Sequence, residues 1–121
     1  MLSSEEIELK DALEAIDYYY KQGWTDRLPI IPPTEDRILE MLKIVNLKPK
    51  TIIVSIPERG RIFTAELVAI NTVMAGCLPC YFPVITSAVE AISAPEFGLY
   101  GPTASTHGAA IMMIVKRANH Q

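Results

Sequence analysis

The chain has 121 residues, enough for one domain, and half of these residues are hydrophobic. A formal net charge of −3 excludes the strongly basic surface of a nucleic-acid-binding protein, and no apolar run is long enough to span a membrane. The N-terminal sequence is acidic and lacks the pattern of a signal peptide, so we expect a cytoplasmic location. A small domain has little interior, so the high apolar content predicts a homo- or hetero-oligomer.

The first third of the chain is predicted to form two helices joined by a proline-rich segment. The first helix is expected over residues 4–22, with Ser4 as its N-cap and Gly23 at its end. Three prolines in a stretch of five residues then force an extended path. The second helix is expected to follow Thr34 and to end near Asn46.

The rest of the chain is predicted to supply a small sheet and two more helices. Residues 51–56 and 109–115 are rich in β-branched and other apolar side chains, which is typical of buried strands. Helices are expected from about residue 65 to 75, after Thr64 as N-cap, and from about residue 83 to 93, with a proline in the first turn.

Two polar segments flank the second predicted strand. Residues 96–108 form a loop rich in Gly, Pro, Ser and Thr, and loops of this length are usually functional. Residues 116–121 form a polar tail. The chain is therefore predicted to be a single compact α/β domain over residues 1–121, in which helices pack on a small sheet.

Both cysteines of the chain lie in one short stretch between the third and fourth predicted helices. Gly76 permits a sharp turn after the third helix, and Cys77 follows it directly. Pro79 precedes Cys80, which falls at or just before the N-terminus of the fourth helix. The positive end of a helix dipole favours a thiolate there. We therefore take this corner as the chemical centre.

Three interpretations of the cysteine pair remain open. Cys77 and Cys80 could act as a dithiol, in which one thiol attacks and the other resolves the mixed disulfide. They could instead bind a soft metal ion such as zinc together with His107, although a closed zinc site needs four ligands. They could also be small buried side chains with no chemistry. The Cys-x-Pro-Cys pattern resembles the thioredoxin active site, but thioredoxin places a strand before it where a helix is expected here, so we exclude that fold.

Three polar residues outside the corner each have a functional and a structural interpretation. Asp26 could position a proton or could cap a turn beside Arg27. Asn71 could support the cysteine corner or could be an amide on a helix surface. His107, in the glycine-flanked loop, could act as a general acid or base or as a ligand, or could bond to the loop backbone.

The sequence also resembles a poorly characterised bacterial family with motifs close to GWTDGLP, PPT and VMAGCRPEYFPVV. The matching stretches begin at Gly23, Pro32, Val73 and Thr106, and the resemblance runs from about residue 18 to 115. Some longer members are associated with a small redox-type partner that carries a UGSC or CGSC motif, in which U is selenocysteine.

The resemblance implies which positions belong to the site. It points to Cys77 as the primary thiol and to Trp24, Asp26, Tyr81 and His107 around it. The sequence departs from the family pattern at Arg27, where the family has glycine, and at Cys80, where it has glutamate. The relatives continue beyond the last predicted strand, which implies one subunit of a split enzyme with a redox or second-subunit partner.

These observations lead to one functional hypothesis and one alternative. The chain is predicted to be a cysteine-dependent enzyme or enzyme subunit acting by thiol chemistry on a sulfur-, selenium- or metal-containing small molecule. The alternative is a non-catalytic metal-binding or assembly subunit that uses Cys77, Cys80 and His107. The residues assigned to catalysis are Cys77, Cys80, His107 and Asp26, and those assigned to substrate binding are Trp24, Tyr81, Asn71 and Thr106.

Overall fold

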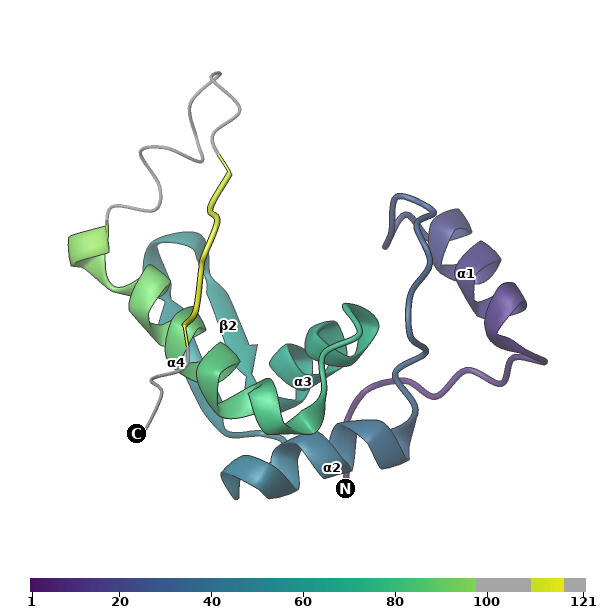
Figure 1. The fold of residues 1–121 in the computed structure, drawn as a ribbon, viewed down its shortest axis with the longest axis horizontal. Coiled ribbons are helices and arrows are strands. Elements are labelled where there is room, and N and C mark those ends of the chain that lie inside the picture. Colours follow the sequence, from purple (N-terminus) through teal and green to yellow (C-terminus); the bar gives the residue numbers. More distant parts are fainter. Residues whose placement is uncertain (98–109, 117–121) are drawn as a thin grey trace.

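The computed structural model describes residues 1–97 and 110–116 and contains helices together with a small sheet (Figure 1). The helices are α1 Ala12–Lys21, α2 Glu35–Val45, α3 Ala65–Met74 and α4 Phe82–Ser93. The strands are β1 Ile52–Ile56 and β2 Arg61–Thr64. Short 3₁₀ turns cover Pro57–Arg59, Pro79–Tyr81 and Pro95–Phe97. The predicted α/β class is therefore confirmed.

The sheet is one antiparallel hairpin. Strands β1 and β2 pair directly, and Ser55 lies opposite Ile62. Gly60 has a φ of +59°, a left-handed backbone that glycine adopts without steric cost and that allows the tight connection. Helix α4 packs on β1 and α3 packs on β2. The hairpin is thus held by helices, which a two-stranded ribbon needs for stability.

The hydrophobic core lies where α2, α3 and α4 meet. Ala65 and Ala69 on α3 have no exposed surface, and their small side chains let α2 approach closely. Phe82, the first residue of α4, is also completely buried and joins the start of α4 to this core. The buried cluster consists of Ile38, Met41, Leu42, Ala65, Val68, Ala69, Val73 and Phe82.

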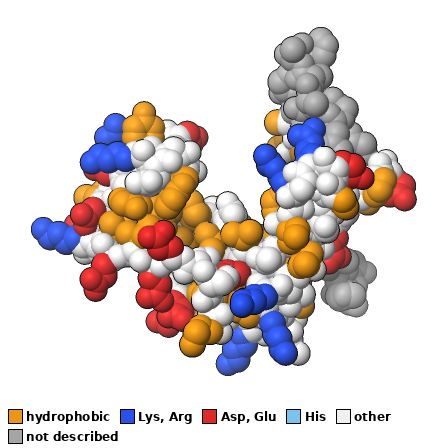
Figure 2. All heavy atoms as spheres, turned by 180° about the vertical axis from the view of Figure 1, so that it is seen from behind, with side chains coloured by type: hydrophobic (Ala, Val, Ile, Leu, Met, Phe, Trp, Pro, Cys, Tyr) orange, Lys and Arg blue, Asp and Glu red, His pale blue; other side chains and the backbone are white. Residues whose placement is uncertain are grey.

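Helix α1 stands to one side of this core, joined to it by extended segments (Figure 1). A hydrogen bond ties the segment after α1 to the core, since the backbone N–H of Ile31 donates to the carbonyl of Met74 at 3.2 Å. Figure 2 shows hydrophobic side chains gathered on the α1 side of the molecule. The exposed ones in this region include Leu13, Tyr20, Trp24 and Leu28.

The first helix is shorter than the sequence predicted. It begins at Ala12, and its N-cap is Asp11, whose side chain accepts a hydrogen bond from the backbone of Glu14 at 2.9 Å. The prediction that Ser4 caps a helix over residues 4–22 is wrong at this end, because Ser3 and Ser4 bond to Glu66 instead.

The second predicted strand is also absent from the part of 109–115 that the structure describes. Residues 110–116 have no regular secondary structure and are exposed. Their apolar, β-branched side chains favour a strand, but a strand also needs a hydrogen-bonded neighbour. Within the described chain, β1 and β2 pair only with each other. Most of the predicted loop 96–108 and of the tail 116–121 lies outside the described residues.

A buried carboxylate fastens the N-terminal segment to α3. Glu66, in the first turn of α3, is only 2% exposed. It accepts hydrogen bonds from the backbone N–H groups of Ser3 and Ser4 at 2.9–3.1 Å and from their hydroxyls at 2.9 and 2.7 Å. Leu2 packs against the core beside them. A buried charge of this kind is stable only when it is hydrogen-bonded in this way.

These hydrogen bonds decide the pKa of Glu66. Burial alone would raise the pKa, but the hydrogen bonds from Ser4 and Ser3 together hold the pKa of this carboxyl below its ordinary value of 4.5. A group whose pKa is lowered by folding stabilises the folded state above its unfolded pKa, and this contribution disappears as the pH falls through the folded pKa.

We expect Glu66→Gln to lower the free energy of unfolding at neutral pH by about 1.5–3 kcal/mol, because hydrogen bonds to a charged group contribute about this much. The wild-type chain should lose this stabilisation as the pH falls below the ordinary carboxyl value of 4.5, whereas the variant has no such carboxyl to protonate. Urea denaturation at several pH values measures both effects. The matched control is Glu90→Gln on α4, an exposed site where little change is expected. If the free energy of unfolding of Glu66→Gln and that of Glu90→Gln changed with pH in the same way, this would contradict the stabilising role assigned to the Glu66 carboxylate.

Candidate functional site

The two cysteines lie where the sequence placed them, at the corner between α3 and α4. Helix α3 ends at Met74, and Gly76 takes a φ of +81°, which reverses the chain. The N–H of Gly76 donates to the carbonyl of Val73 at 2.9 Å and the N–H of Cys77 to that of Thr72 at 3.2 Å. These bonds satisfy carbonyls that the helix end would otherwise leave without partners.

Cys80 lies in the 3₁₀ turn Pro79–Tyr81, directly before α4. Cys80 is exposed, whereas Cys77 is half-buried, and the two cysteines are not joined by a disulfide. Phe82, two residues after Cys80, is completely buried in the core. The corner is thus anchored at both ends and presents one shielded and one accessible thiol.

Cys77 lines two cavities on the described surface. The smaller, of about 240 Å³, lies against α2 and is lined by Arg37 and Glu40 as well as by apolar residues. The larger, of about 520 Å³, lies among α3, α4 and the hairpin. Cys77 is the residue that these two cavities have in common. A ligand in either cavity would therefore lie next to Cys77.

The larger cavity is mostly apolar. Its polar lining comes from Asn71, Thr72, Ser93 and Cys77, and none of its lining residues apart from the cysteine is ionisable. The side chain of Asn71 donates to the carbonyl of Leu67 at 2.9 Å within its own helix. Asn71 therefore shares a cavity with Cys77, as a substrate-binding residue would, although its amide is engaged by the helix backbone.

The segment after α1 carries two further predicted site residues, Asp26 and Trp24. The carboxylate of Asp26 accepts a hydrogen bond from the backbone N–H of Leu28 at 3.0 Å, which is the turn-capping arrangement. Trp24 packs edge-on against Tyr18 and Tyr19, with ring centroids 6.0 and 5.3 Å apart. Neither Asp26 nor Trp24 lines a cavity that Cys77 lines.

The remaining predicted site residues fall into two groups. Tyr81 is 53% exposed, lies next to Cys80 in the 3₁₀ turn and lines neither cavity. Thr106 and His107 lie outside the described residues. Within residues 1–97 and 110–116, no three His, Cys, Asp or Glu side chains come together as a metal site would need. The zinc interpretation thus depends on the part of the chain around His107.

Arg37 and Glu40 were not among the residues that sequence reasoning selected. Their spacing of three residues places them on one side of a helix, but such pairs are common on helix surfaces. Only the packing of α2 beside the 3₁₀ turn at Pro79–Tyr81 brings them to the cavity at Cys77. The sequence carries no signal for that contact.

Comparison of the chain with models of protein families, with curated proteins and with solved structures finds no match.

Among the described helices, none has the length and apolar character required to cross a membrane.

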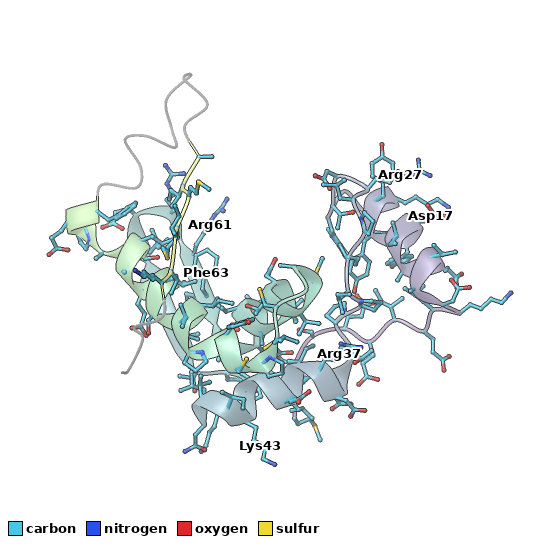
Figure 3. All side chains as sticks on the ribbon, in the orientation of Figure 1. Asp17, Arg27, Arg37, Lys43, Arg61 and Phe63 are labelled. Atoms are coloured by element: carbon cyan, nitrogen blue, oxygen red, sulfur yellow. The ribbon has the colours of Figure 1, made fainter. Side chains whose placement is uncertain are left out.

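Arg27 has an unusual backbone beside α1. Its φ is +77°, a left-handed value that costs a residue with a side chain about 1–2 kcal/mol. Its guanidinium lies 3.4 Å from the carboxylate of Asp17 and 5.2 Å from the ring centre of Tyr20 (Figure 3). Both members of the ion pair are exposed, so the pair contributes little to offset this strain.

We expect Arg27→Gly to be more stable than Arg27→Ala by about 1 kcal/mol, because both variants lose the contacts with Asp17 and Tyr20 and only glycine relieves the backbone. Thermal or urea denaturation of the two variants measures the difference. The control is Lys43, exposed in α2, where alanine should be the more stable by about 1 kcal/mol. If alanine were more stable than glycine at Arg27 as well as at Lys43, the backbone at Arg27 would not be strained.

Proposed function

We propose that the chain is a cysteine-dependent enzyme or enzyme subunit that acts by thiol chemistry on a sulfur-, selenium- or metal-containing small molecule. The observation that carries this proposal is the position of Cys77, half-buried and shared by two cavities. Binding sites for small molecules are concave and mostly apolar, with few polar groups, and the larger cavity has this character. Cys77 is the nucleophile in this proposal.

Cys80 is the resolving thiol. Cys80 lies three positions after Cys77, and because it is exposed, its thiol is accessible after the first step. In an exchange with a disulfide, Cys77 attacks one sulfur and the other half of the substrate leaves as a thiol. Cys80 then attacks Cys77 and releases the bound half, which leaves a disulfide between the two cysteines. His107 and Asp26 are the proposed proton-transfer residues, although Asp26 would have to leave its turn bond to Leu28.

The family resemblance belongs to the same proposal. The left-handed backbone at Arg27 supports it, because the family motif has glycine at that position and glycine adopts this backbone without strain. The proposed relation adds a redox or second-subunit partner, and we also propose a cytoplasmic location.

A second candidate function is an assembly subunit, which could bind a metal through Cys77, Cys80 and His107. The exposed apolar segment 110–116 favours assembly. Met112 and Ile114 are each 84% exposed, which is costly for large apolar side chains in water. We propose that a second copy of the chain covers this segment in a homo-oligomer.

The catalytic proposal is tested with 2-hydroxyethyl disulfide, a small neutral substrate, and mass spectrometry of the intact chain. We expect wild-type protein to end as the internal disulfide and Cys80→Ser to stop as a mixed disulfide on Cys77. Cys77 should react about tenfold faster than an ordinary exposed thiol, because a bound substrate lies beside it. The reference thiol is Ser87→Cys on α4 in a chain that lacks both native cysteines, since Ser87 is exposed.

Two results would contradict this proposal. A thiol at position 77 that reacts only after unfolding would show that Cys77 is a buried structural residue. A stoichiometric metal, found by elemental analysis of protein purified without chelator, that protects both thiols would favour the metal-binding alternative.

The assembly proposal is tested by substituting charged residues for exposed apolar residues of segment 110–116. Met112→Lys and Ile114→Lys should each raise the dissociation constant of the homo-oligomer by at least about tenfold. Each substitution places a charge in the proposed interface, which favours the monomer. Sedimentation velocity over a range of concentrations measures the shift, and Glu58→Lys, exposed on the hairpin turn, is the control. A wild-type chain that stays monomeric at every concentration would refute self-association.

A further inference from the structure

The smaller cavity carries opposite charges beside the thiol of Cys77. Arg37 and Glu40 of α2 line it, and every other lining residue apart from Gly76 and Cys77 is apolar. Its volume is about 240 Å³, which suits a small metabolite. A site with one cation and one anion next to a sulfur nucleophile has a definite chemical preference.

The packing of α2 fixes these two charges at the cavity. Ile38, Met41 and Leu42 are buried in the core, so α2 cannot turn about its axis. Arg37 and Glu40, three residues apart, project from the same side of the helix. Figure 3 shows Arg37 on the part of α2 nearer to α1, far from Arg61 on the hairpin.

Both charges are available to a ligand. Arg37 and Glu40 are exposed, and within the described residues neither takes part in an ion pair or a side-chain hydrogen bond. A guanidinium binds a carboxylate well, and a carboxylate binds an ammonium group. One molecule satisfies both when it carries an α-carboxylate and an α-ammonium on the same carbon.

We propose that the smaller cavity binds the zwitterionic head of a small sulfur-containing α-amino acid and presents its sulfur to Cys77. This inference rests on the thiol chemistry proposed above and adds the substrate class. The larger cavity is the poorer site for such a head, because its lining has no ionisable side chain besides Cys77. Charged groups are stable in a cavity only where partners compensate their lost hydration.

The reaction then follows with all atoms accounted for. The thiolate of Cys77 attacks the sulfur of a bound amino-acid disulfide. A bond forms between the two sulfurs, the substrate S–S bond breaks, and the departing half takes the proton that Cys77 gave up. The thiolate of Cys80 attacks the sulfur of Cys77 and releases the bound half, which takes the proton from Cys80. The two cysteines lose two electrons and two protons in total, and the substrate disulfide gains them.

The test compares four small disulfides that differ in charge. Cystine is zwitterionic at each end, cystamine is cationic, dithiodiglycolate is anionic and 2-hydroxyethyl disulfide is neutral. The measurement is the rate at which each forms a mixed disulfide on Cys77 in the Cys80→Ser protein. We expect cystine to react faster than the neutral disulfide.

Substitution of each charge should then change the order in a characteristic way. Arg37→Gln should slow cystine and the anionic disulfide by about two- to fivefold, and Glu40→Gln should slow cystine and the cationic disulfide by a similar factor, as exposed ion pairs permit. Each slowing is measured relative to the rate of the same variant with the neutral disulfide, because the loss of a charge beside Cys77 changes the reactivity of its thiol toward every disulfide. Arg61→Gln and Glu58→Gln change the net charge equally at exposed positions that line neither cavity, and they should change no rate.

The outcomes separate this inference from the function on which it rests. Equal rates for all four disulfides, or equal effects of the cavity and hairpin variants, would overturn the amino-acid assignment while leaving Cys77 as a reactive thiol. Failure of Cys77 to react with any of the four, including the neutral one, would overturn both proposals.

Discussion

The burial of Phe82 is the contact on which the arrangement of the candidate site depends. Phe82, at the first position of α4, is completely buried in one cluster with residues of α2 and α3. The chain between the end of α3 and this residue must therefore turn within a short stretch, and Gly76 supplies the reversal. The two cysteines are carried on that turn. Their position follows from the packing of the helices as much as from the motif itself.

The same packing explains why Cys77 faces two different environments. On one side lie α3, α4 and the hairpin, whose apolar faces leave a largely uncharged hollow. On the other side lies α2, whose exposed edge supplies Arg37 and Glu40. Cys77, at this junction, borders one charged and one mostly apolar cavity. The chemistry of the two hollows therefore determines which molecule would be held long enough to react.

Local signals explain most of what the sequence predicted. Thr64 as N-cap, the broad apolar face of α3 and Pro83 in the first turn of α4 act within a few residues, so the helices around the corner were predictable. The failures involve distant partners. Ser4 was expected to begin a helix, but it lies 62 residues from Glu66, the group that binds it. Likewise, Ile114 lies in a segment with the composition of a strand, but this segment has no pairing strand within the described chain. Arg37 and Glu40 belong to the site only through tertiary packing.

The long sequence separation of the Glu66 contacts has a consequence for the order of folding. Ser3 and Glu66 are 63 residues apart, so closing this loop loses much chain entropy before the hydrogen bonds form. Helices α2 and α3 and the hairpin involve shorter loops and should assemble first. The N-terminal segment would then attach last and detach first. Hydrogen exchange at the amides of Ser3 and Ser4 should therefore report a local opening that is faster than the global unfolding sensed by the amides of α3.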